Sequence, residues 1–170
     1  RAVRRLVLYG ALPLVIAGAV LGGLLPATEP PSPARQAHPS LAYDDTLVNP
    51  FRQASADTLR ASALREGRHL YAKLCSHCHG GKADGTGPMA RGLALAPTNF
   101  HDPGTIATLV EGYAYRRVEA GGMGLPAAGT PWDSAMPRWK DDLDADSIFK
   151  ILLAEYDLAG TSPRAPERLE

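Results

Sequence analysis

The sequence predicts an all-α fold: a small helical domain preceded by one N-terminal transmembrane helix and an extended linker. The chain has 170 residues and begins with an uncharged apolar run from Leu6 to Leu25. A proline-rich stretch follows that run. Beyond it, three segments carry apolar residues at three- and four-residue spacings, which is the period of an amphipathic helix. No segment shows the alternation of apolar and polar residues that is typical of a strand.

The N-terminal run is long enough to cross a bilayer. As a helix rising about 1.5 Å per residue it would span about 30 Å, the thickness of the hydrocarbon layer. Arg1, Arg4 and Arg5 precede the run, and basic flanks favour the cytoplasmic side. We therefore expect residues 1–25 to form a single-pass anchor in the cell membrane, with a cytoplasmic N-terminus and a periplasmic C-terminal part. A cleaved signal peptide or a twin-arginine export signal is the alternative.

Residues 26–56 are predicted to form an extended linker. Six prolines lie between Pro26 and Pro50, and such a composition favours polyproline conformations. A few apolar residues along the linker are candidate anchors: Leu41, Tyr43, Leu47, Val48 and Phe51. We expect them to lie against partner subunits, and packing on the chain's own domain is the alternative.

Three helices are expected within the domain of residues 57–158, and residues 159–170 form a tail. The first begins at Asp57, with Asp57 or Ser55 as its cap, and leads into a pair of cysteines. The second covers residues 105–119 and ends at a Gly-Gly pair. The third covers residues 144–156, where Asp144 caps an apolar face.

Composition indicates a cofactor and excludes some functions. The formal net charge is zero, so nothing indicates a nucleic-acid partner. Apolar residues make up 45% of the chain, but aromatic residues only 6%, which is little for a core built from side chains alone. A large apolar cofactor would supply the missing part of that core.

The two cysteines belong to the motif Cys75-Ser76-His77-Cys78-His79. This C-x-x-C-H spacing is the attachment signature of c-type haem. Two thiols one helical turn apart can add to the two vinyl groups of the porphyrin, and the following histidine can bind the iron. A thioredoxin-like redox pair would need a βαβ context, and a zinc site would need a second ligand pair. We therefore predict one covalent haem c, bound through Cys75 and Cys78, with His79 as an iron ligand.

Several motifs around this site resemble the class I, mitochondrial-type cytochromes c, here in a membrane-anchored form. The resemblance runs from Gly67 to Tyr156 and rests on the following segments: Gly67-x-x-x-Tyr71, C-S-H-C-H-G at 75–80, D-G-T-G-P at 84–88, P-T-N-F at 97–100, S-A-M-P-R-W at 134–139 and the closing helix. It implies a small all-α fold in which the first and last helices cross near Gly67 beside the haem.

The resemblance also implies that Met136, in the M-P pair, is the sixth iron ligand. A thioether stabilises ferrous iron and raises the reduction potential, and Met/His ligation is the pattern of cytochromes c. Met123, between glycines, is the rival. Met89 is expected in the core, and His101 is the candidate for a bis-histidine site.

Further residues are expected around the haem. Tyr71, Pro97, Phe100 and Trp139 are candidates for lining its pocket, and Arg91, Trp132, Arg138 and Trp139 for binding its propionates. The pair Arg116-Arg117 fits either a docking patch or, as for most such pairs, solvated side chains. The acidic residues from Asp141 to Asp146 fit either a docking patch or a helix start.

These features predict an electron carrier and not an enzyme. Its expected partners are membrane lipid, subunits of an integral membrane redox complex of a respiratory or photosynthetic chain, and a donor or acceptor protein. Ligation by His79 and Met136 would leave no open position on the iron for a substrate. A haem enzyme or gas sensor with a labile sixth ligand, and a structural subunit of a larger assembly, are the alternatives.

Overall fold

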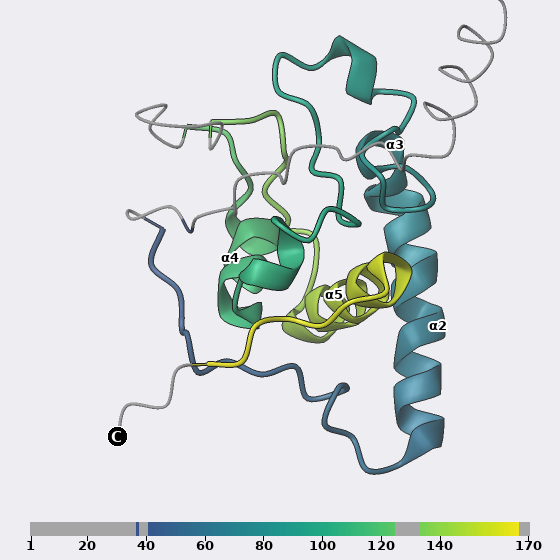
Figure 1. Ribbon diagram of the computed structural model, residues 1–170. Coiled ribbons are helices and arrows are strands. Elements are labelled where there is room, and N and C mark those ends of the chain that lie inside the picture. The colour runs from purple at the N-terminus through teal and green to yellow at the C-terminus, as the bar shows by residue number, and fades with distance from the viewer. Residues whose placement is uncertain (1–36, 38–40, 125–132, 167–170) are drawn as a thin grey trace, which may run out of the picture. The chain divides into compact units, whose positions relative to one another are not determined.

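The computed structural model describes residues 37, 41–124 and 133–166. Within these residues the fold is helical, as predicted (Figure 1). Its elements are α2 (Asp57–Leu74), α3 (Ser76–His79), the 3-10 turns η1 (Ala90–Gly92) and η2 (Ile106–Thr108), α4 (Glu111–Ala120) and α5 (Ala145–Ala159). The described part of the chain contains one isolated β-bridge, between Val110 and Arg164, and its other regular elements are helices.

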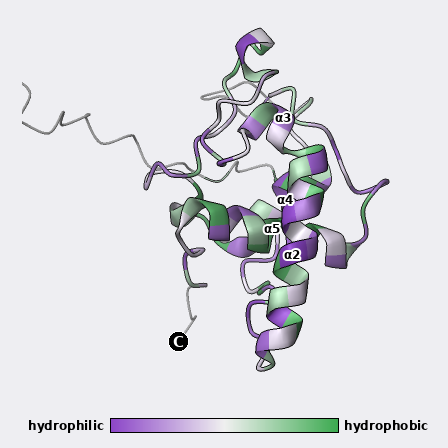
Figure 2. Cartoon of the chain, turned by 90° about the vertical axis from the view of Figure 1, so that its right-hand side faces the viewer, coloured by the Kyte–Doolittle hydropathy of each residue, from purple (hydrophilic) through white to green (hydrophobic). Residues whose placement is uncertain are grey.

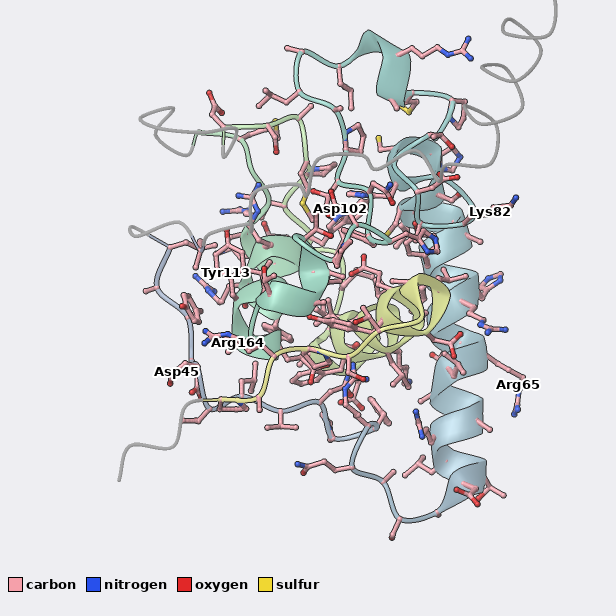
Figure 3. All side chains as sticks on the ribbon, in the orientation of Figure 1. Asp45, Arg65, Lys82, Asp102, Tyr113 and Arg164 are labelled. Carbon is pink, nitrogen blue, oxygen red and sulfur yellow. The ribbon has the colours of Figure 1, made fainter. Side chains whose placement is uncertain are left out.

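Helices α2 and α5 cross each other, as the resemblance implied (Figure 1). The crossing depends on Gly67, because a Cβ atom there would lie 1.9 Å from the carbonyl oxygen of Lys150. One face of α2 is buried at Ala63, Gly67 and Tyr71, and the remainder alternates between hydrophilic and hydrophobic residues along its length (Figure 2). Figure 3 shows Arg65 on the outer side of α2, away from α5.

The start of α2 differs from the expectation. Its N-cap is Ala56, which supplies no side-chain hydrogen bond, so neither Ser55 nor Asp57 caps the helix. Asp57 lies in the first turn, where a negative charge still interacts favourably with the helix dipole.

The second predicted helix begins later than expected. Residues 105–119 were predicted as one helix, but η2 and an extended pair precede α4, which starts at Glu111. The reason lies in the tail: Arg164 N–H donates to the carbonyl of Leu109 at 3.0 Å, and Val110 bridges to Arg164. This pairing holds Leu109 and Val110 in extended conformations. The end at Gly121 is as predicted, with φ +71°.

Helix α5 supplies most of the buried apolar surface. Asp144 caps it as predicted, accepting a hydrogen bond from the backbone N–H of Ser147 at 2.8 Å. The helix continues three residues beyond the predicted Tyr156 and ends at Gly160 in the left-handed conformation. Its buried residues are Ile148, Phe149, Ile151, Leu152, Leu153, Ala154, Glu155 and Tyr156. Glu155 is the charged member of this set.

Residues 41–56 pack on the helical domain. Leu41 is buried with Leu109, Val110 and Tyr113, and the ring of Tyr43 meets that of Tyr113 edge-on at 5.4 Å. This part of the predicted linker therefore packs on the chain's own domain, as the alternative had it, and contacts with partner subunits stay a prediction.

Polar contacts hold the same segment in place. Asn49 is fully buried, and its side-chain amide donates to the carbonyl of Phe149 at 2.7 Å. Arg52 forms an ion pair with the buried carboxylate of Glu111 at 2.9 Å, and the backbone N–H of Asn49 donates to the same carboxylate. Gly112 also lies against this segment, because a Cβ atom there would meet the carbonyl oxygen of Asp44.

The predicted membrane anchor, residues 1–25, lies outside the described residues. Within the part that the structure describes, no helix is both long and apolar enough to cross a membrane.

Candidate haem site

The C-x-x-C-H motif lies at the junction of α2 and α3. Cys75 follows the last residue of α2, and its carbonyl accepts the backbone N–H groups of Cys78 at 3.1 Å and His79 at 2.9 Å. The two cysteines are therefore one helical turn apart, as covalent attachment to two vinyl groups requires. Tyr71 fixes the turn after the motif, because its hydroxyl donates to the carbonyl of Gly80 at 2.8 Å.

A cavity of about 340 Å³ opens beside this motif. Cys75, Cys78 and His79 line one part of it, and Met136 and Trp139 line another. The rest of the lining is largely apolar and includes Leu74, Met89, Leu93, Leu95, Ala96, Pro97, Val118, Ala135 and Pro137. A smaller cavity of about 60 Å³ shares His79 and Met136 with the larger one and reaches α4.

The imidazole of His79 is oriented by its neighbours. Its Nδ1 lies 3.5 Å from the carbonyl oxygen of Thr98, to which an N–H at this position donates. The ring of Phe100 stacks on the imidazole, with centroids 4.9 Å apart and an angle of 17°. A hydrogen bond at Nδ1 leaves Nε2 as the nitrogen for a metal, which is the usual arrangement of a metal-binding histidine.

The segment with Met136 is tied by its backbone to the end of α4. The carbonyl of Met136 accepts from Gly122 N–H at 2.9 Å, and Trp139 N–H donates to the carbonyl of Val118 at 3.3 Å. Gly121 allows the close approach, because a Cβ atom there would lie 2.7 Å from the carbonyl oxygen of Met136. These contacts place Met136, 57 residues after His79 in the sequence, on the wall of the same cavity.

The rival ligands are placed less favourably. Met123 is 66% exposed and lines neither cavity. Met89 lies on the wall of the larger cavity but is 56% exposed, so its predicted place in the core is wrong. His101 is exposed, and its Nε2 lies 2.6 Å from the carbonyl oxygen of Lys82. His77 is exposed at the edge of the larger cavity.

The other predicted pocket residues divide into two groups. Pro97 and Trp139 line the larger cavity and Phe100 the smaller one, as expected. Tyr71 lines neither and instead holds the turn at Gly80.

Of the four candidates for binding the haem propionates, Trp139 lies on a cavity wall. Arg91 lines neither cavity, and Arg138 forms an exposed ion pair with Asp141 at 2.5 Å. Trp132 lies outside the described residues, and Trp139 remains as a candidate on the cavity wall.

Two charged residues on the cavity walls were not predicted. Arg117 on α4 and Glu155 on α5 each line both cavities, with exposed fractions of 7% and 5%. The solvated alternative is therefore wrong for Arg117, whereas its neighbour Arg116 turns outward to the carbonyl of Ala42 and to Glu119. Helical spacing was the available signal, since Arg117 follows Tyr113 by four residues and Glu155 follows Leu152 by three.

Burial changes the acid–base properties of the site. It raises the pKa of the Glu155 carboxyl from an ordinary 4.5 to about 8. It also raises the pKa of the Cys75 thiol, and the negative charge of Glu155 adds to that effect. A thiol kept neutral in this way fits a role in structural attachment rather than one as a thiolate nucleophile.

The residues on the cavity walls fit a haem. Two cysteine sulfurs one turn apart, an oriented imidazole and a thioether all face one largely apolar space. A volume of this order is typical of small-molecule sites. In the haem-bound protein, the two free thiols of the structure would be thioethers.

Comparison with known families agrees with this site. Residues 62–153, more than half of the chain, match the model of the family described as cytochrome C oxidase, cbb3-type, subunit III. The chain belongs to this family. As a member of the cbb3-type subunit III family, it contains a small, mostly helical monohaem cytochrome c domain that binds haem c covalently. No curated protein and no solved structure gives a significant match to the chain.

Proposed function

We propose that this chain is the electron-carrying subunit of a membrane redox complex, with Cys75 and Cys78 holding the haem covalently and His79 and Met136 binding its iron. The observation that carries the proposal is that all four side chains line one apolar cavity. Membership in the cbb3-type subunit III family supports haem-based electron transfer without a catalytic role of the subunit's own.

Residues around the cavity position the two proposed iron ligands. The haem supplies the one-electron chemistry of its iron. The Thr98 carbonyl orients His79, and the backbone contacts of Gly121 and Gly122 hold Met136 in reach of the cavity. A thioether ligand favours the ferrous state and raises the potential. If His79 and Met136 both bind the iron, they would leave it no position open to a substrate.

The family name and the N-terminal sequence together support a place at the membrane. The name refers to a subunit of a cbb3-type cytochrome oxidase. The uncharged run of residues 6–25 behind Arg4 and Arg5 supports a single-pass anchor with the haem domain on the periplasmic side. We propose that the chain passes single electrons between a membrane-bound redox partner and a neighbouring acceptor in a respiratory complex of this kind or a related photosynthetic one.

Carbon monoxide binding tests the electron-carrier proposal against a haem enzyme or sensor. The haem-loaded full chain is reduced, mixed with carbon monoxide and followed by stopped-flow absorption. We expect reversible one-electron reduction and no rapid formation of a carbon monoxide complex. Rapid binding would show an open or labile sixth position and would contradict the proposal.

A further inference from the structure

Glu155 is a buried acid on the wall of the haem site. It lies on α5 between buried apolar neighbours, is 5% exposed and lines both cavities. An apolar residue at this position would cost less folding free energy, because a buried carboxylate loses its hydration.

Glu155 differs from the other buried glutamate of the domain. Glu111 is paired with Arg52 at 2.9 Å and accepts the backbone N–H of Asn49 at 3.1 Å. None of the ion pairs formed by the described residues includes Glu155, and burial is the cause that raises its pKa. Its carboxyl group therefore lies on the cavity wall outside the ion pairs that the described residues form.

The tyrosine and cysteine groups near Glu155 do not favour its ionised form. Tyr71 on α2, Cys75 at the junction of α2 and α3, and Tyr156 on α5 itself interact with it electrostatically. All three are neutral groups. Burial raises their pKa values most, and the charge of Glu155 adds to the effect, after that of Glu111 in the case of Tyr156. The other titratable or charged residues on the walls of these cavities are His77, His79 and Arg117. Burial holds the pKa of Glu155 at about 8, so a modest change of nearby charge changes its protonation near neutral pH.

We propose that Glu155 couples electron transfer at this site to proton transfer. At a pH between the carboxyl pKa values of the oxidised and reduced states, each electron that arrives at the haem is accompanied by the uptake of up to one proton from solvent by the Glu155 carboxylate. Each electron that leaves is accompanied by release of that proton to solvent. This inference rests on the proposed electron-transfer function and adds proton transfer by Glu155 to that function.

The physical reason is the electrostatic interaction between two charges that share a water-poor site. An added electron makes the haem more negative and raises the affinity of the nearby carboxylate for a proton. Linkage makes the effect reciprocal, so protonation of Glu155 favours the reduced state. Between the carboxyl pKa values of the oxidised and reduced states, the redox equilibrium constant shifts up to tenfold per pH unit, or 59 mV for a one-electron couple, and the potential falls as the pH rises.

The test is a spectroelectrochemical titration of the haem-loaded full chain from pH 5 to pH 10. The wild type should show a potential that falls with pH over part of this range. In Glu155→Gln, which keeps the shape but cannot ionise, the slope should vanish and the potential should match or exceed the low-pH value of the wild type. Glu66→Gln, which changes an exposed carboxylate on α2, should behave like the wild type.

Two outcomes overturn the inference while the electron-transfer function stands. One is a reversible wild-type potential that does not depend on pH. The other is a pH-dependent potential in Glu155→Gln, because another acid group would then cause the dependence.

If Glu155→Gln fails to bind haem, infrared difference spectra of reduced minus oxidised wild type test the same inference. A carboxylic acid C=O band that grows on reduction supports proton uptake, and its absence contradicts it. Failure of the haem to reduce reversibly at any pH would instead contradict the proposed function.

Discussion

At the scale of single residues, our proposal is that the sulfur atoms of Cys75 and Cys78 hold the haem. Replacing either by serine should leave one thioether at most, because serine oxygen does not add to a vinyl group as a thiol does. The double variant should lose all covalent haem. The measurement is the haem that stays on the chain after denaturation, with Ser76→Ala as the control between the two cysteines. Both single variants retaining full covalent haem in two thioether bonds would refute the attachment assignment.

Met136 is the proposed sixth ligand of the iron, and a separate variant tests it. Met136→Ala removes the proposed soft ligand, so the reduction potential should fall on the order of 100 mV, within the roughly 0.8 V that axial ligands span, and carbon monoxide should bind. Met123→Ala is the matched control, because Met123 is exposed and lines neither cavity. If the Met123 variant alone showed these changes in redox titration, Met123 and not Met136 would be the iron ligand.

The sequence identifies the residues of the site that a local pattern or a known motif marks. The spacing of Cys75, Cys78 and His79 is local, and the M-P pair marks Met136. Arg117 and Glu155 are different, because a charged residue on a helix is ordinarily solvated. Helical spacing places both on the inner faces of α4 and α5, but the packing of these helices around the cavities is what shows that the two side chains are buried.

At the scale of elements, the crossing of α2 and α5 depends on the absence of a side chain at Gly67. In an ordinary helix, Gly→Ala stabilises by about 1 kcal/mol. Here the added Cβ would lie 1.9 Å from the carbonyl oxygen of Lys150, so the helices must separate. Gly67→Ala should therefore destabilise the domain by about 3 kcal/mol, at the upper end of overpacking costs.

Thermal unfolding of the haem-loaded protein measures this effect. Gly92→Ala is the control, because a Cβ atom at Gly92 meets nothing within 4 Å. An unchanged or higher melting temperature for Gly67→Ala would show that the helices do not meet in this way.

The segment of residues 41–56 forms a second element-scale contact. A chain lacking residues 1–56 loses Arg52 and leaves the buried carboxylate of Glu111 without its cation. Unpairing a buried charge costs about 3–5 kcal/mol, so its melting temperature should fall clearly. A chain lacking residues 1–40 keeps this ion pair and should melt like the full chain. Equal melting temperatures for the two truncated chains would show instead that the segment does not stabilise the domain.

Elements were predictable where the signal is local. The apolar spacing of α2 and α5, the cap at Asp144 and the stop at Gly121 are all read from neighbouring residues. The late start of α4 depends on Arg164, far away in the sequence. The packing of residues 41–56 likewise depends on Asn49 and Glu111, which pair across the fold. Such long-range contacts leave no periodic pattern.

At the scale of the whole molecule, the cavity explains the low aromatic content. Buried side chains form one cluster around Tyr113 and another around Ile148 and Leu152. The apolar cavity of about 340 Å³ lies beside the motif, where a haem supplies apolar surface that side chains do not. The cofactor is thus part of the core, and the four proposed binding residues define its place.

The most direct test of the His79/Met136 assignment is the optical spectrum of the oxidised, haem-loaded full chain. Methionine bound to ferric iron gives a weak absorption band near the red end of the visible spectrum. We expect this band in the wild type and in Met123→Ala, its loss in Met136→Ala, and no open iron position in the reduced wild type. A wild-type spectrum without the band, together with rapid carbon monoxide binding, would contradict the account of this chain as an electron carrier.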